Sequence, residues 1–513
     1  MKQSHTRIMN TLGRLFAIWV LFLVACSPNQ PPTPTAAAAP QSTASIEPLP
    51  SPATVSAQNA RAKYVFLFIG DGMGYAQIQL ADMYKQSTAV SSSRASLSFS
   101  QFPTQGRVTT RSANSAVTDS AAAGTALATG RKTDNGVLGK DPTLKRNFES
   151  VSAAAERAGM KIGIISSVSI NHATPAAFYA HQGSRNSYYS IALQLGTSRF
   201  DYFGGGGFNQ PRGTTKTQKS AYDVAVEHGY THISDIATFR ALKPSDKKIF
   251  ATYPNLLNAG EMPWSIDQPQ MQPSLADFTA KGIDLLKNRE HGFFMMVEGG
   301  KIDWSCHDND AATTIHEVLA FDAAVRRALS FYESHKDDTL IVVTADHETG
   351  GLSMGNNTLP MTLQIDVLQY QRCSLATLEG KIQQALQQKA SFDTVLGLIA
   401  ENTGLGDEQK RLPLTDTELA LLKQAYTAAS SPNPEYGQTD IALPEKKKRR
   451  GMNLSTLAID ILNQKAGINW GTLMHSGIDV PVFAIGIGAD QFQGPLDNTD
   501  IPKQLSRIMG LSQ

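Results

Sequence analysis

The chain has 513 residues, so it can bury a large core and form up to about three domains. Its formal net charge of +1 at pH 7 excludes the broad positive field of a protein that binds nucleic acid through charge alone. It has three cysteines, Cys26, Cys306 and Cys373, which are too few for a disulfide framework.

The first 26 residues have the organisation of an export signal. Basic residues precede an apolar run over residues 15–25 that is too short to span a bilayer comfortably. The run ends in Leu23-Val-Ala-Cys26, which resembles the lipobox of bacterial lipoproteins. This resemblance implies a lipid anchor on Cys26 and a location in the bacterial cell envelope. The residues around the cysteine resemble those of lipoproteins that are transported to the outer membrane. An ordinary signal peptide with a coincidental cysteine is the alternative.

Residues 27–60 are rich in proline, alanine, serine and threonine, with almost no large apolar side chains. Such a segment cannot bury enough surface to fold. We therefore expect a disordered tether between the signal and a folded body.

The rest of the chain alternates between apolar runs and segments with helical periodicity. The runs predict strands at residues 64–69, 106–111, 161–167, 292–298, 339–345 and 480–486. The periodic segments predict helices at residues 75–85, after Asp119-Ser120, and at 150–158, 275–287 and 311–334. This alternation predicts an α/β fold, a three-layer, doubly wound, mostly parallel sheet built from residues 61–351 and 469–513. Residues 198–273 show no clear pattern and are expected to be rich in loops.

Residues 352–468 interrupt the alternation. Residues 375–389 and 414–428 have the pattern of amphipathic helices, so we expect a mostly helical insertion that forms a cap over the functional site or a dimer interface. A basic cluster at residues 445–450 is interpreted as a solvated loop.

The first predicted strand ends in an aspartate held between glycines. Asp71 follows the run at residues 64–69, and the glycines allow a sharp turn as the chain leaves the sheet. Open α/β sheets bind ligands at the carboxyl ends of their strands, so Asp71 is a candidate ligand-binding residue. A simple helix cap is the alternative.

Further carboxylates and imidazoles lie near other strand ends. They are Glu298, Asp303, His307, Asp346, His347 and His475. The four-residue spacing of Asp303 and His307 places both side chains on one face of a helical turn. Zinc binds imidazole nitrogen and carboxylate oxygen, so these residue types at one sheet edge predict a metal site.

Ser120 is a candidate nucleophile. It begins an alanine-rich predicted helix, where free amide groups and the helix dipole attract an anion. A serine in this position is by itself more often an N-cap. A metal beside it would stabilise its alkoxide and make it reactive.

A series of motifs resembles the alkaline phosphatase family, in the order in which that family has them. They are Ile69-Gly-Asp-Gly-Met-Gly74, Thr118-Asp-Ser-Ala-Ala122, His172-Ala-Thr-Pro175, Ser184-Arg185, Val297-Glu-Gly299, Ile302-Asp303 with His307, Thr344-Ala-Asp-His347 and His475-Ser-Gly477. The resemblance covers roughly residues 60–355 and 468–510.

The resemblance implies a metal-dependent hydrolase that releases phosphate from varied phosphomonoesters through a phosphoserine at Ser120, with Arg185 binding two phosphate oxygens. It also implies two zinc ions and one magnesium ion. One zinc would be held by Asp303, His307 and His475, the other by Asp71, Asp346 and His347, and the magnesium by Asp71, Thr174 and Glu298.

Two positions depart from part of the family. His172 stands where some members have aspartate, and Trp304 stands where they have lysine. We expect both side chains on the substrate side of the site, with a changed affinity for magnesium and weaker retention of product phosphate.

Other interpretations remain open from the sequence. A sulfatase-like hydrolase of the same superfamily would place its nucleophile in a Cys-x-Pro-x-Arg context, which Ser120 lacks, and a phosphodiesterase would usually use threonine. A lipoprotein that only binds phosphate or metal is a third. Members of the family are commonly dimers, so by analogy we expect a homodimer.

Overall fold

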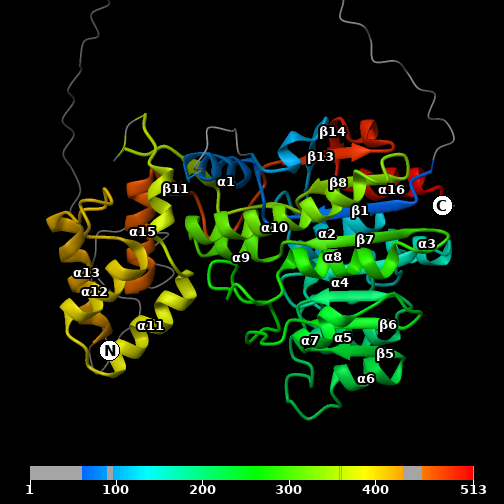
Figure 1. Ribbon diagram of the computed structural model, residues 1–513, viewed down its shortest axis with the longest axis horizontal. Helices are drawn as coiled ribbons and strands as arrows, with labels where there is room; N and C mark the ends of the chain where they lie inside the picture. Colours follow the sequence, from blue (N-terminus) through cyan, green and yellow to red (C-terminus); the bar gives the residue numbers. More distant parts are fainter. Residues whose placement is uncertain (1–60, 89–95, 358, 360, 431–452, 512–513) are drawn as a thin grey trace, which may run out of the picture. The chain divides into compact units, whose positions relative to one another are not determined.

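The computed structural model describes residues 61–88, 96–357, 359, 361–430 and 453–511 (Figure 1). The predicted signal with Cys26, the predicted tether and the basic cluster at residues 445–450 lie outside the described residues. None of the helices in the described segments is both long enough and apolar enough to cross a membrane.

Ten strands form one sheet, in the order β14-β2-β13-β8-β1-β7-β3-β4-β6-β5. Neighbouring strands are parallel except where β13 pairs with β8 and with β2. This confirms the predicted α/β fold with a mostly parallel sheet. The strands are β1 (Tyr64–Ile69), β2 (Thr104–Thr109), β3 (Lys161–Ser166), β4 (Tyr202–Gly205), β5 (Tyr230–Ile233), β6 (Lys248–Thr252), β7 (Phe293–Glu298), β8 (Thr339–Thr344), β13 (Val480–Gly486) and β14 (Gly494–Asp497).

The helices around the sheet begin and end within a few residues of the predicted ones where a prediction was made. They are α1 (Tyr75–Thr88), α2 (Ser120–Thr129), α3 (Val151–Arg157), α4 (Ala173–Ala176), α5 (Tyr188–Thr197), α6 (Ala221–Glu227), α7 (Ile236–Ala241), α8 (Leu275–Leu286), α9 (Lys301–His307), α10 (Ala311–Tyr332) and α16 (Asp500–Met509). Local sequence explains several ends. α8 starts at a capping box of Ser274 and Asp277, and α2 stops at Gly130, whose φ is 69°.

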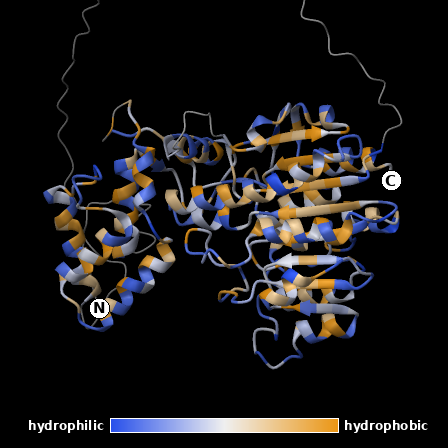
Figure 2. Cartoon of the chain, viewed as in Figure 1, coloured by the Kyte–Doolittle hydropathy of each residue, from blue (hydrophilic) through white to orange (hydrophobic). Residues whose placement is uncertain are grey.

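The central strands are covered on both faces. Every residue of β1, β7 and β8 is buried, and Figure 2 shows hydrophobic residues gathered on the strands. Met295 of β7 lies beside Gly282 of α8, whereas its neighbour Phe294 stacks on Phe178, just after α4. Successive side chains of a strand point to opposite faces, so helices lie on both faces and the fold has three layers. Burial on both faces explains why these strands are apolar runs rather than alternating patterns.

Residues 198–273, expected to be rich in loops, extend the sheet by three parallel strands. These are β4, β6 and β5, with α6 and α7 between them in the chain. β4 and β5 have only four residues each, and β4 contains two glycines. Most of the region is irregular, as expected, but runs this short do not stand out from loop sequence, so its strands and helices were not predicted.

The insertion is helical where the structure describes it. It contains α11 (Leu375–Gln387), α12 (Phe392–Thr403), α13 (Asp416–Ala429) and α15 (Leu454–Ala466), of which α12 and α15 are absent from the sequence prediction. These helices enclose a second hydrophobic core, which reaches α1 through Leu80 and α10 through Ile315. The insertion therefore packs on two helices of the α/β core.

Candidate active site

The candidate site lies where three adjacent strands end. β1 pairs with both β7 and β8, and Ile69 lies opposite Glu298 on one side and Thr344 on the other. Asp71 and Asp346 each follow two residues after their strand. Because the strands are parallel and in register, the carboxylates of Asp71, Glu298 and Asp346 are delivered to one edge of the sheet.

Asp303, His307 and His475 form a first candidate metal-binding group. It is called the half-exposed group below because its two histidines are partly exposed, although Asp303 is buried. His307 Nε2 and His475 Nε2 lie 3.3 and 3.6 Å from Asp303 Oδ1, and 3.2 Å from each other. The Nδ1 atom of His307 lies 2.5 Å from the carbonyl oxygen of Leu473, and that of His475 lies 2.8 Å from the carbonyl oxygen of Thr118. Both rings thus turn Nε2 toward the carboxylate, which is the orientation of metal-binding histidines.

A small second sheet brings His475 to the site. β12 (His475–Ser476) pairs in antiparallel fashion with β9 (Glu348–Thr349), and His475 lies opposite Thr349. The ring of His475 stacks on that of His347, with centroids 3.6 Å apart. The pairing joins the segments before and after the insertion, so His475, which is distant in sequence, reaches the strand ends.

Asp71, Asp346 and His347 form a second candidate group, called the buried group below because all three are completely buried. His347 Nε2 lies 3.4 Å from Asp71 Oδ1 and 3.3 Å from Asp346 Oδ2. The same nitrogen lies 3.2 Å from Ser120 Oγ. Asp303 also approaches this group, since its ligand atom is within 4.8 Å of those of Asp71 and His347.

His172 belongs to a third candidate group, with Asp71 and Glu298, because their ligand atoms lie within 4.8 Å of one another. Thr174 Oγ1 donates a hydrogen bond to Asp71 Oδ2 at 3.4 Å. Ser166, which the sequence analysis did not single out, donates to Glu298 Oε2. His172, expected on the substrate side, therefore lies among the ligands expected for magnesium.

Several oxygens of these groups are buried and accept no hydrogen bond within the described part of the chain. They include Asp71 Oδ1, Asp346 Oδ2 and Glu298 Oε1. A buried carboxylate oxygen without a donor is costly, whereas a divalent cation would coordinate it. The residues present therefore fit bound metal ions.

Ser120 begins α2, and Asp119 caps this helix by accepting a hydrogen bond from Ala122 N at 3.0 Å. The other carboxylate oxygen of Asp119 accepts from Arg185 Nη1 at 2.9 Å, and Arg185 Nη2 lies 3.3 Å from His172 Nε2. The guanidinium is thus held in place beside the first turn of α2. Sequence analysis missed the role of Asp119, whose only signal is its position next to the candidate nucleophile.

The sequence matches the model of the alkaline phosphatase family over residues 62–511. The chain belongs to the alkaline phosphatase family. It is therefore a metal-dependent phosphomonoesterase that acts on small-molecule phosphoesters.

Individual relatives agree with this assignment. The phosphatase is 32% identical over 408 residues to alkaline phosphatase 4 of Bacillus subtilis, an alignment that covers 77% of each protein. A cold-active alkaline phosphatase from Shewanella sp. is 29% identical, with a TM-score of 0.71 and coverage of 87% of this chain and 99% of that one. A mutant of the TAB5 alkaline phosphatase with Mg bound in the M3 site is 25% identical, with a TM-score of 0.61 and coverage of 88% and 99%.

Crowded, buried carboxylates define the electrostatics of the phosphatase site. Burial, together with Asp346 and Asp303, raises the pKa of Asp71 well above its usual range. Burial and Asp303 raise the pKa of Asp346 to about 7. Burial also raises the pKa of Glu298 to about 8, although the hydrogen bond from Ser166 opposes the shift. Carboxylates that resist ionisation in one another's presence mark a functional site suited to cations.

In the half-exposed group, the pKa shifts favour the charged forms of Asp303 and His307. Burial would raise the pKa of Asp303, but His307 lowers it. Burial would likewise lower the pKa of His307, but Asp303 raises it to about 9. In the buried group, burial and the nearby His475 lower the pKa of His347 well below its usual range, so its imidazole is neutral and able to bind a metal.

Trp304 and Cys306 lie on α9 beside the ligands. The ring of Trp304 meets that of His172 edge to face, with centroids 5.8 Å apart and an interplanar angle of 77°. Trp304 therefore lies next to the contact between His172 and Arg185. Cys306 is fully buried, and burial raises the pKa of its thiol well above the usual range, as expected of a packed thiol.

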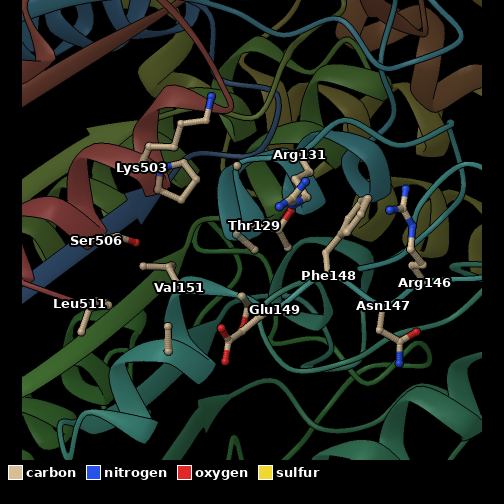
Figure 3. A pocket seen from close by; sticks show the side chains of 15 residues that line it. Thr129, Arg131, Arg146, Asn147, Phe148, Glu149, Val151, Lys503, Ser506 and Leu511 are labelled. Atoms are coloured by element: carbon tan, nitrogen blue, oxygen red, sulfur yellow. The ribbon is translucent and has the colours of Figure 1, made fainter. Parts of the chain in front are cut away.

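A cavity of about 580 Å³ lies at the C-terminal end of α2 (Figure 3). Ser120 lies at the other end of this helix. Side chains of α2, α3 and α16 line it, together with Arg131, Phe148 and Glu149 from the segment between α2 and α3. None of the candidate metal ligands lines this cavity, so it is separate from the active site.

Proposed function

We propose that this alkaline phosphatase transfers the phosphoryl group of its substrate to Ser120 and then to water. This proposal rests on the contact between Ser120 Oγ and His347 Nε2, which are 3.2 Å apart. Around this contact lie carboxylate oxygens that accept no hydrogen bond in the described chain. A hydroxyl in that position can lose its proton only if cations offset the negative charge around it.

The metal assignment is two zinc ions and one magnesium ion. The half-exposed group and the buried group each combine carboxylate with imidazole, a donor set that suits zinc. The third group offers Asp71, Thr174 and Glu298, whose oxygens suit magnesium, with His172 as an additional neighbour. When bound, neighbouring divalent cations stabilise negative charge on the attacking and leaving oxygens of an in-line displacement.

The protein's own groups perform the positioning. Ser120 Oγ attacks phosphorus as the bond to the leaving oxygen breaks, and water later breaks the bond between phosphorus and Oγ to release inorganic phosphate. The fork of Arg185, held by Asp119, binds two phosphate oxygens in both steps. Because phosphoryl transfer depends on positioning and charge more than on contacts to the leaving group, we expect broad specificity for phosphomonoesters.

Turnover of 4-nitrophenyl phosphate tests this proposal. We expect zinc-dependent hydrolysis at alkaline pH that Ser120→Ala lowers by at least about 10³-fold. Ser455→Ala, which alters a buried serine of the insertion, is the matched control and should keep full activity. A Ser120→Ala protein that still turns over at the normal rate would reject the phosphoserine. A preference for a phosphodiester or a sulfate ester would favour the related hydrolases instead.

We also propose that a lipid on Cys26 anchors the enzyme in the bacterial cell envelope, with residues 27–60 as a tether. Its support is the lipobox-like Leu23-Val-Ala-Cys26. Cys26→Ala should move the protein from the membrane fraction to the soluble fraction, and its retention in membranes would count against the anchor. By analogy with the family we propose a homodimer, which the molar mass in solution tests.

A further inference from the structure

Thr349 lies between the half-exposed group and the buried group. It is completely buried, and its hydroxyl oxygen lies 2.5 Å from Asp303 Oδ1 and 3.2 Å from His347 Nδ1. The first atom belongs to the half-exposed group and the second to a ring of the buried group. One hydroxyl therefore contacts both.

The direction of each hydrogen bond follows from the chemistry of the partners. Asp303 Oδ1 also faces the Nε2 atoms of His307 and His475, so it serves as a negative acceptor in that group. A carboxylate oxygen can only accept, which makes the Thr349 hydroxyl the donor. Because the hydroxyl donates its one proton to Asp303, it can only accept a hydrogen bond from His347.

It follows that His347 donates from Nδ1. A neutral imidazole carries one proton, so a ring protonated at Nδ1 presents a bare lone pair at Nε2. That nitrogen is the one that faces Asp71, Asp346 and Ser120. The hydroxyl thus selects the form of His347 that can bind a metal beside the nucleophile.

The surrounding chain is built to hold this threonine. Its backbone N–H donates to Gly72 O at 3.1 Å, and its carbonyl accepts from Gln77 Nε2 at 2.8 Å. Gly72 has φ of 74°, and a Cβ atom there would lie 2.9 Å from Thr349 Oγ1 and 2.8 Å from Asp303 Cα. Only glycine leaves room at position 72 for this contact.

We propose that Thr349 is a positioning residue whose hydroxyl joins His347 to Asp303 and so orients one ligand of each zinc at once. This inference deepens the proposed function and rests on it. Its consequence is that the two metal-binding groups are coupled, because removing one hydroxyl leaves a nitrogen in the buried group and an oxygen in the half-exposed group without that partner.

The test compares side chains that differ only in the hydroxyl. Thr349→Val keeps the shape of threonine, and Thr349→Ser keeps the hydroxyl. The first measurement is zinc affinity of the metal-free full chain in competition with a chromophoric chelator, followed by kcat and KM. We expect Thr349→Val to weaken zinc affinity about 10–100-fold and to lower kcat more than it raises KM, while Thr349→Ser stays close to the unmodified protein. Thr279→Val, which removes a buried hydroxyl bonded to Leu275 O in α8, is the control and should leave zinc affinity unchanged.

A second pair keeps the test decisive should Thr349→Val not fold. Thr349→Ala and Thr349→Ser again differ by one hydroxyl, and they should differ in zinc affinity in the same direction. The proposal is overturned if the variants without a hydroxyl bind zinc as tightly as those with one, or if Thr349→Ser loses as much affinity as Thr349→Val. Failure of the underlying mechanism looks different, since Ser120→Ala would then remain active whatever stands at position 349.

Discussion

The half-exposed group and the buried group use the same residue types in opposite surroundings. In the former, 30% of the His307 side chain and 13% of the His475 side chain are exposed. In the latter, Asp71, Asp346 and His347 have no exposed surface, and Ser120 is 1% exposed. Solvent therefore reaches the half-exposed group, while the buried group is sealed among the strand ends.

This difference in exposure determines how each group balances its charges when no metal is bound. In the half-exposed group, Asp303 and His307 compensate each other as a carboxylate beside an imidazolium whose pKa is about 9. The buried group has no such compensation, because burial keeps His347 neutral and raises the pKa of both its acids. The side with Ser120 thus depends on cations to offset its negative charge, whereas the side that faces solvent has room for an entering or departing group.

Loss of a ligand should therefore cost more in the buried group. We expect Asp346→Asn to lower kcat by more than about 100-fold, since even outer partners of metal ligands are worth 10–100-fold. His475→Gln should cost less, because water can reach the half-exposed group and replace the lost ligand. Measuring kcat and bound zinc after dialysis against a weak chelator checks this order. Equal losses for the two variants would remove the distinction between the groups.

In the role proposed for Arg185, binding of two phosphate oxygens, its planar fork matters as much as its charge. Arg185→Lys should lower kcat/KM by about 10²-fold, since lysine cannot hold two phosphate oxygens and Asp119 together. Arg199→Lys, in an exposed ion pair with Glu156, is the matched control and should be neutral. A fully active Arg185→Lys protein would show that charge alone suffices.

The stability of the metal-free protein should fall as pH rises from about 6.5 to 8. The pKa values of Asp346 and Glu298 are about 7 and 8 when folded and near 4 when unfolded, so the folded state holds their protons longer. Their contribution is complete below about pH 4 and is lost as pH rises through 7 and 8. His307, with a pKa of about 9, acts in the same direction, and Lys301, lowered by burial to about 8, opposes them only above that pH.

Thermal unfolding of chelator-treated protein across this pH range measures the effect. Asp346→Asn should flatten the decline, because it removes one of the titrating acids, and saturating zinc should reverse it. A melting temperature that stays constant or rises from pH 6.5 to 8 would contradict the assignment of raised pKa values to the buried acids.

The smallest expected effect concerns Trp304 of α9, whose ring contacts that of His172. Trp304→Lys adds a positive charge near the phosphate position, so product phosphate should inhibit more strongly, by up to about fivefold for a partly solvated pair. Met271→Lys adds the same charge at an exposed position elsewhere and should leave phosphate inhibition unchanged. If Trp304→Lys also leaves it unchanged, Trp304 has no part in the retention of phosphate.

Sequence patterns predicted the centre of the fold because its strands are buried on both faces. β1, β7 and β8 are continuous apolar runs, so the sequence shows where each strand ends. Asp71, Glu298 and Asp346 could be predicted as site residues because they stand at these ends. The spacing of Asp303 and His307 was equally local, since one turn of α9 joins them. The short strands β4 and β5 were missed because four residues carry too little pattern.

By itself, then, the sequence determined the family and the α/β core. It also supplied the candidate carboxylates, imidazoles, serine and arginine of the proposed chemistry, because each stands in a local motif. Only the tertiary structure decided how they combine: that His172 joins Asp71 and Glu298, that Asp119 holds Arg185, and that Thr349 joins His347 to Asp303. These contacts connect segments far apart in the chain. They arise from parallel strand register and from the pairing of β9 with β12, and no local pattern encodes either.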